Sequence, residues 1–74
     1  NPTTSIQYAI SSTQFVTLKV YDVLGKEVAT LINEDKPAGM YQVNFDASGL
    51  SSGVYIYTLK INRVSFSKSM MLIK

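Results

Sequence analysis

The chain has 74 residues, of which 46% are hydrophobic and 16% are charged, and its formal net charge is +2. This length fits one domain with a small core, and the hydrophobic content excludes a chain that is disordered by default. Cysteine and histidine are both absent, which excludes disulfides, thiolate and imidazole metal sites, and catalysis by histidine.

The basic residues do not form a block. Four of the seven lie in the last fifteen positions, spread along predicted strands: Lys60, Arg63, Lys68 and Lys74. This spacing predicts no nucleic-acid partner. The apolar segment Met70–Ile73 is far too short to span a bilayer. The chain begins at Asn1-Pro2 without an initiator methionine or a signal peptide, so we expect residues 1–74 to be a domain excised from a larger protein.

Two strands are predicted at the start of the chain. Residues 6–10 alternate apolar with small or polar side chains, which is typical of a half-buried strand. Residues 15–21 give the clearest alternation in the sequence, with Val16, Leu18 and Val20 on one face. The apolar face of each strand is expected to face the core.

A hairpin is predicted where Asp22 starts a type I turn and Gly25 takes the left-handed position. A third strand follows over residues 27–32. Val28 and Leu31 are both core candidates although the period of two puts them on opposite faces, which indicates a β-bulge. A short helix is the alternative, but the shortness of the segment and the turn residues around it favour the strand.

A solvated loop is predicted over residues 33–39, which contain the only charge run in the sequence. A fourth strand follows, with Tyr41, Val43 and Phe45 on its inward face. It ends in a cluster of turn-forming residues at 46–52, rich in serine, glycine and aspartate.

Leu50 is the one large apolar residue in this turn cluster, so we expect its side chain to pack into the core. The strand after the turn carries Tyr55, Tyr57 and Leu59 on one face, and its opposite face is partly apolar as well. A strand that is apolar on both faces is usually central in its sheet. The last strand is predicted over residues 64–73.

Six strands with short polar connections and no helical segment predict an all-β, antiparallel domain. At this size a two-sheet sandwich is the economical way to bury the inward faces, and a small barrel is the alternative. The predicted core contains the residues in the inward phase: Leu18, Val20, Tyr41, Val43, Phe45, Leu50, Tyr55, Tyr57 and Leu59.

One catalytic pattern occurs in the sequence. Gly49–Gly53 matches G-x-S-x-G, but that chemistry needs a strand-turn-helix context and a histidine that accepts the serine proton. The spacing of the aspartates is too wide for a calcium-binding loop formed by Asp22, Asp35 and Asp46. Binding of a single calcium ion at the surface remains an alternative. We therefore predict no enzymatic activity, no catalytic or metal residues and no cofactor.

Most of the aromatic residues fall on predicted inward faces, where their side chains are part of the hydrophobic core. Phe15, Tyr21 and Phe66 are the ones expected to be exposed. If they formed a strip on one flat face, a glycan-binding or adhesive accessory module would be favoured. This is the alternative function.

Four segments together closely resemble the type A C-terminal sorting domain of the type IX secretion system: Val16–Leu31, Pro37–Gly39, Phe45–Leu50 and Ser52–Tyr55. The related immunoglobulin-like domain of flagellar hook-capping proteins shares much of this pattern, and a hook-cap scaffold is a third hypothesis. The resemblance extends over essentially the whole chain. It implies an antiparallel immunoglobulin-like β-sandwich of six to seven strands.

The resemblance also implies a function. Such domains lie at the extreme C-terminus of secreted and surface proteins of Bacteroidetes, and they carry the export signal for an upstream cargo domain. The implied partners are the outer-membrane type IX export apparatus and a sortase-like peptidase that removes the domain at the cell surface. We accordingly expect a secreted or cell-surface, non-enzymatic, monomeric domain.

The family's recurrent elements match positions of this chain, which are therefore the candidate sorting-signal residues: Asn1, Pro2, Gly53, Tyr55, Lys68, Met70, Leu72 and Lys74. The second Asn-Pro that usually lies further upstream is absent here. Gly53 is expected to permit a turn, and Tyr55 to be a core anchor whose hydroxyl bonds a backbone group, as in a tyrosine corner. The charges of Lys68 and Lys74 are expected to be solvent-exposed.

Overall fold

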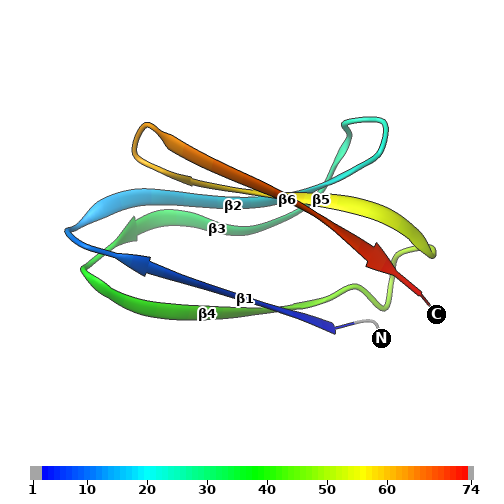
Figure 1. The fold of residues 1–74 in the computed structure, drawn as a ribbon, viewed down its shortest axis with the longest axis horizontal. Helices are drawn as coiled ribbons and strands as arrows, with labels where there is room; N and C mark the ends of the chain where they lie inside the picture. Colours follow the sequence, from blue (N-terminus) through cyan, green and yellow to red (C-terminus); the bar gives the residue numbers. More distant parts are fainter. Residues whose placement is uncertain (1–2, 74) are drawn as a thin grey trace.

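A computed structural model describes residues 3–73, which form six β-strands and no helix (Figure 1). The strands are β1 (Thr3–Ile10), β2 (Gln14–Asp22), β3 (Glu27–Lys36), β4 (Gly39–Asp46), β5 (Gly53–Ile61) and β6 (Val64–Leu72). They form a two-stranded sheet, β1-β4, and a four-stranded sheet in the order β3-β2-β5-β6, with every pairing antiparallel. The predicted immunoglobulin-like β-sandwich is confirmed.

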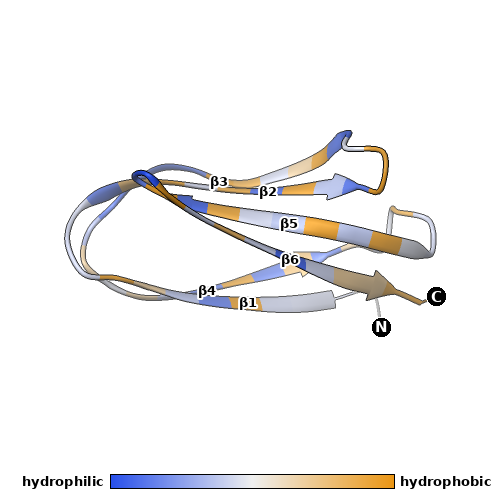
Figure 2. Ribbon diagram, turned by 45° about the horizontal axis from the view of Figure 1, so that its top comes forward, coloured by the Kyte–Doolittle hydropathy of each residue, from blue (hydrophilic) through white to orange (hydrophobic). Residues whose placement is uncertain are grey.

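The central position predicted for the fifth strand is also confirmed. β5 lies between β2 and β6, so both of its edges are paired among the described strands. Figure 2 shows hydrophobic bands along β5. Val54 and Ile56 lie on one face of the strand and Leu59 and Ile61 on the other, as expected for a central strand that is apolar on both faces.

The expected β-bulge is present in β3, and it occurs twice. Leu18 lies opposite Ile32 and Lys19 lies opposite Thr30, so Leu31 has no counterpart in β2. The same shift occurs two residues further along β2, between Val20 and Tyr21, and leaves out Val28. An extra residue in one strand reverses the phase of the side chains that follow it. Both core candidates are therefore half-buried, and the helical alternative is wrong.

The predicted loop over residues 33–39 begins too early, and this prediction is wrong for its first four positions. β3 continues to Lys36, which lies opposite Gln14, and Glu34 lies opposite Val16. These positions form an edge strand that has only β2 as its neighbour. Charged side chains are common on such edges because they discourage pairing with another chain.

The turn between β2 and β3 has the predicted chemistry. The Asp22 carboxylate accepts hydrogen bonds from the backbone N–H groups of Leu24 and Lys26, each at 2.9 Å. Gly25 has a φ of +86°, a conformation that residues with a side chain rarely adopt. Asp22 and Gly25 therefore fix the hairpin as the sequence indicates.

The core consists of two clusters along the length of the sandwich. The first contains Ile6, Tyr8, Ile10, Val16, Leu18, Ile32 and Leu59, and the second contains Val20, Phe45, Ala47, Tyr55 and Leu72. Of the predicted core, five residues are buried and the other four are half-buried: Tyr41, Val43, Leu50 and Tyr57. None of the nine is exposed, so the predicted core is confirmed. Residues 3–73 contain no helix long and apolar enough to cross a membrane.

Candidate functional site

Gly53 begins β5 and needs a backbone conformation that favours glycine. Its φ is +157°, while a Cβ atom placed there would meet no other atom within 4 Å. The requirement at this position is therefore conformational and does not come from a lack of space. Gly53 sets the direction in which the chain leaves the turn and enters the central strand.

Tyr55 anchors the start of β5 from two sides. Its ring is buried in the second core cluster, and its hydroxyl donates a hydrogen bond of 2.8 Å to the backbone carbonyl of Ser51. The turn residue and the strand are thus held together by a side chain of the strand itself. The expected backbone partner of this hydroxyl is confirmed.

The same arrangement occurs a second time, at the start of β4. Gly39 has a φ of +155°, and the Tyr41 hydroxyl donates a hydrogen bond of 2.5 Å to the backbone carbonyl of Pro37. In both units a glycine lies two residues before the tyrosine, and the carbonyl lies four residues before it. The unit at Gly39 and Tyr41 was not predicted, although the repeated spacing Gly-x-Tyr is visible in the sequence.

Tyr41 also organises its surroundings. Its ring stacks on Tyr8 with 5.3 Å between centroids, and the Lys36 ammonium lies 5.2 Å from its centroid. The Glu34 carboxylate, 2.7 Å from this ammonium, raises the pKa of Lys36 above its usual value. Burial raises the pKa of Tyr8, whose hydroxyl has no hydrogen-bond partner among the described residues.

The register of β5 and β6 brings the two separate elements of the predicted signal together. Gly53 lies opposite Leu72, and Tyr55 lies opposite Met70. Lys68 is opposite Tyr57, the next residue on the same face. Asn1, Pro2 and Lys74 lie outside the described residues. Five of the eight candidate residues therefore share one stretch of a single strand pair.

Within β6, however, the candidates differ in exposure. Leu72 is 6% exposed and Met70 is half-buried, and both contact the second core cluster. Lys68 is exposed, as predicted for its charge. Met71 and Ile73, which were not singled out from the sequence, are 69% and 63% exposed. The alternation of the strand therefore places the half-buried Met70 and the buried Leu72 on one face and the exposed Met71 and Ile73 on the other.

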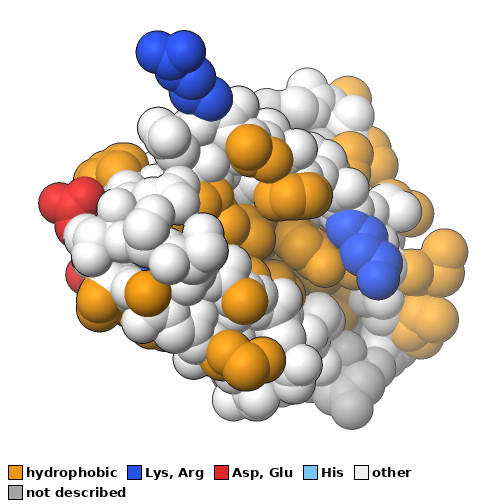
Figure 3. Space-filling view, turned by 60° about the vertical axis from the view of Figure 1, so that its left-hand side comes forward, with side chains coloured by type: hydrophobic (Ala, Val, Ile, Leu, Met, Phe, Trp, Pro, Cys, Tyr) orange, Lys and Arg blue, Asp and Glu red, His pale blue; other side chains and the backbone are white. Residues whose placement is uncertain are grey.

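The inward face of β6 is only partly covered by the opposite sheet. Phe66 lies opposite Leu59 and so shares the face of a core residue, yet it is 56% exposed. Figure 3 shows a hollow with a hydrophobic floor on this side of the molecule and a basic side chain beside it. Lys68 is among the residues that line this hollow.

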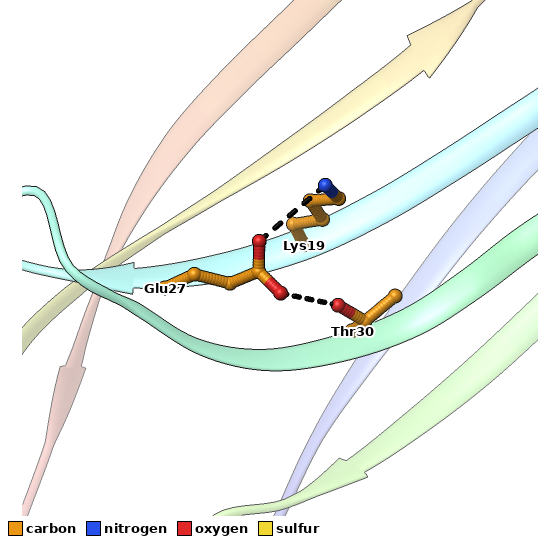
Figure 4. A network of polar contacts seen from close by, with 3 residues as sticks. All are labelled: Lys19, Glu27 and Thr30. Atoms are coloured by element: carbon orange, nitrogen blue, oxygen red, sulfur yellow. Dashed lines mark hydrogen bonds and ion pairs between the residues drawn. The ribbon is translucent and has the colours of Figure 1, made fainter.

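A polar network lies at the other edge of the large sheet (Figure 4). Glu27 accepts a hydrogen bond of 2.5 Å from the Thr30 hydroxyl and lies 3.4 Å from the Lys19 ammonium. The hydrogen bond from Thr30, and then that from Lys19, hold the pKa of Glu27 below its usual value. All three residues are on β2 and β3, so they support the bulged edge and not the candidate site.

The arrangement offers exposed side chains for recognition. Residues 3–73 contain no group of three or more acidic residues that could hold a metal ion. Ser51 contributes its carbonyl oxygen to the bond with Tyr55, and the chain has no histidine to activate its hydroxyl.

Of the three aromatic residues expected to be exposed, Phe15 and Phe66 are exposed and Tyr21 is half-buried, and the three do not share a face. Phe15 and Tyr21 alternate with the buried residues of β2 and lie on the outward face of the large sheet. Phe66 lies on the inward face, opposite Leu59. A single flat strip of these three aromatic residues is therefore ruled out.

The comparisons with known proteins support one family. A family model described as the secretion system C-terminal sorting domain matches residues 1–74, which is the whole chain. Comparison with curated proteins and with solved structures gave no significant match. The match confirms the resemblance noted in the sequence.

Proposed function

Because the chain belongs to the family of type IX secretion system C-terminal sorting domains, we propose that it directs an upstream cargo domain through the outer membrane to the cell surface. The family match over residues 1–74 is the observation that carries this proposal. Members of this family serve as sorting signals and are not catalytic, and we extend both properties to this chain. Its partners would be the outer-membrane export apparatus and a sortase-like peptidase that removes the domain.

Exposure separates the candidate signal residues into two groups. Tyr55 and Leu72 are buried in the core, so a folded domain cannot present their side chains to a receptor, and Gly53 has no side chain to present. Lys68 is exposed on the same strand pair. We propose that the export apparatus recognises the exposed side chains of β6 and the terminal lysine, and that the buried residues hold this strand in position.

A reporter fused upstream of the domain tests the proposal in a bacterium that has the export system. Replacing the two flanking lysines, Lys68→Ala with Lys74→Ala, is expected to abolish surface delivery of the reporter. The melting temperature of the purified domain should barely change, because Lys68 is exposed and the substitution of an exposed residue usually alters stability by less than about 0.5 kcal/mol. Lys60→Ala is the matched control, since Lys60 is an exposed lysine of β5 outside the terminal segment. Surface delivery that persists in the double variant contradicts a signal that depends on these lysines.

The alternative function, a glycan-binding or adhesive module, depended on an exposed aromatic strip. Because Phe15 and Phe66 lie on opposite faces of the large sheet, no observation favours that function. It becomes the better account only if surface delivery proves independent of the whole domain.

A further inference from the structure

The two sheets of the sandwich are unequal, and this leaves one strand edge beside an uncovered surface. Among the described residues, β1 pairs only with β4, so its other edge faces no strand. On the opposite sheet, Val64, Phe66 and Lys68 lie on the inward face of β6 and are nevertheless exposed. The space beside β1 and above β6 therefore corresponds to a missing third strand of the smaller sheet.

A groove occupies this space. It encloses about 470 Å³, with Tyr8 and Ala9 of β1 on one side and Leu59, Phe66 and Lys68 of the large sheet beneath and opposite. Figure 3 shows its hydrophobic floor. A groove that is walled by an unpaired strand and floored by apolar side chains fits an extended chain, whose backbone bonds the edge while alternate side chains pack on the floor.

The edge of β1 lacks the features that normally prevent such pairing. Edge strands are usually protected by charges, prolines or bulges. The edge strand β3 has two bulges and three consecutive charged residues, Glu34–Lys36. Over residues 3–10, by contrast, β1 has no charged residue and no proline, and its register with β4 is unbroken. The edge of β3 therefore has features that prevent pairing, and the edge of β1 has none of them.

The charge at the groove indicates what kind of strand would bind. Lys68 is the only charged residue among the described residues that line it. A second copy of this chain would offer its own β1, which has no carboxylate, and it would bring a second Lys68 close to the first. An acidic side chain in the bound strand would instead pair with Lys68 across the groove.

We propose that the edge of β1 over residues 6–9 binds an extended segment of a partner protein by strand addition, and that this segment has apolar residues on its inward face and a carboxylate opposite Lys68. The inference goes beyond the proposed export function and does not depend on it.

A synthetic peptide tests the proposal on the 74-residue chain. The probe alternates threonine with valine over nine residues and has one glutamate on its valine face. A second peptide has lysine in place of this glutamate. Two further peptides have N-methyl groups on one or the other alternate set of amides, because an edge-paired strand directs only one set towards the protein. Binding is followed by the amide resonances of the isotope-labelled protein and by fluorescence anisotropy.

The glutamate peptide is expected to shift the amide resonances of Ile6–Ala9, and methylation of only one amide set should abolish its binding. Lys68→Glu is expected to weaken binding of the glutamate peptide by about fivefold and to favour the lysine peptide. Phe66→Thr should also weaken binding, because it removes part of the floor. Lys60→Glu and Phe15→Thr are the matched controls, since neither residue lines the groove, and Phe15 is exposed to a similar degree at 51%.

Four results would overturn the proposal. The first is no binding at concentrations up to about 1 mM. The second is a set of shifts on β3 or β4 instead of β1, and the third is equal binding of the glutamate and lysine peptides. The fourth is self-association of the free chain in sedimentation experiments that the peptide reverses, which would identify a second copy as the occupant.

Discussion

Tyr55 lies directly opposite Met70 in the pairing of β5 with β6, and one step along the ladder Gly53 lies opposite Leu72. The two parts of the proposed sorting signal are therefore neighbours in one strand pair. A substitution at Tyr55 changes the support under β6 as well as the core. Loss of export in a variant at Tyr55 consequently does not distinguish a lost contact with the apparatus from a displaced terminal strand.

The hydroxyl groups of Tyr55 and Tyr8 give a matched pair of stability predictions. Tyr55→Phe removes the bond to the Ser51 carbonyl and should lower the free energy of unfolding by about 1 kcal/mol. Tyr8→Phe removes a buried hydroxyl with no partner among the described residues and should raise the free energy of unfolding by about 1 kcal/mol. Urea unfolding of both variants measures the difference. Equal effects of the same sign would contradict this account of the two hydroxyls.

The φ of Gly53 predicts an asymmetry between two glycines of the same turn. Gly53→Ala should lower the free energy of unfolding by about 1–3 kcal/mol, because alanine is strained at a φ of +157°. Gly49 has no positive φ and has open space around it. Gly49→Ala should therefore be neutral, or stabilising by up to about 1 kcal/mol, through the entropy of the unfolded chain. Thermal unfolding decides this prediction, and a Gly53→Ala variant as stable as the parent protein would refute it.

The Glu27 network predicts how stability changes with acid. Hydrogen bonds from Thr30 and Lys19 hold the pKa of Glu27 below its usual value of 4.5 in the folded state. The resulting stability is present above pH 4.5 and is lost as the pH falls through the lower folded pKa. Glu27→Gln and Thr30→Val should both reduce the loss of stability below pH 4.5. The free energy of unfolding is measured against pH for each variant. If both variants lose as much stability below pH 4.5 as the parent protein does, this network is excluded as a source of the pH dependence.

The strands of this fold follow from the sequence because most of their residues obey a period of two. Val16, Leu18 and Val20 are buried in β2 as predicted, and the conflict between Val28 and Leu31 correctly indicated a bulge. The end of β3 could not be predicted in the same way. Its last residues are charged because they form an edge, and charged residues at an edge resemble a solvated loop in the sequence.

The candidate site was predicted less completely, because its geometry depends on pairing between distant residues. The partner of the Tyr55 hydroxyl is local and was expected from the motif. The register that places Gly53 opposite Leu72 depends on the long-range pairing of β5 with β6. The uncovered face at Phe66 depends on the division into two and four strands, which local patterns do not determine.

The last prediction separates structure from recognition within β6 itself. Leu72 is buried among core residues, so Leu72→Ala should lower the free energy of unfolding by about 2–5 kcal/mol. Met71 and Ile73 are exposed on the same strand end, so Met71→Ser with Ile73→Ser should change stability by less than about 0.5 kcal/mol per site. If the export apparatus recognises exposed side chains of the folded domain, the double variant loses surface delivery of a fused reporter although its melting temperature is unchanged. Leu72→Ala should regain delivery at a growth temperature at which it is folded, since Leu72 only positions the strand. Normal delivery by the double variant, together with failure of a folded Leu72→Ala protein, would mean that the apparatus recognises this strand only after it has left the core.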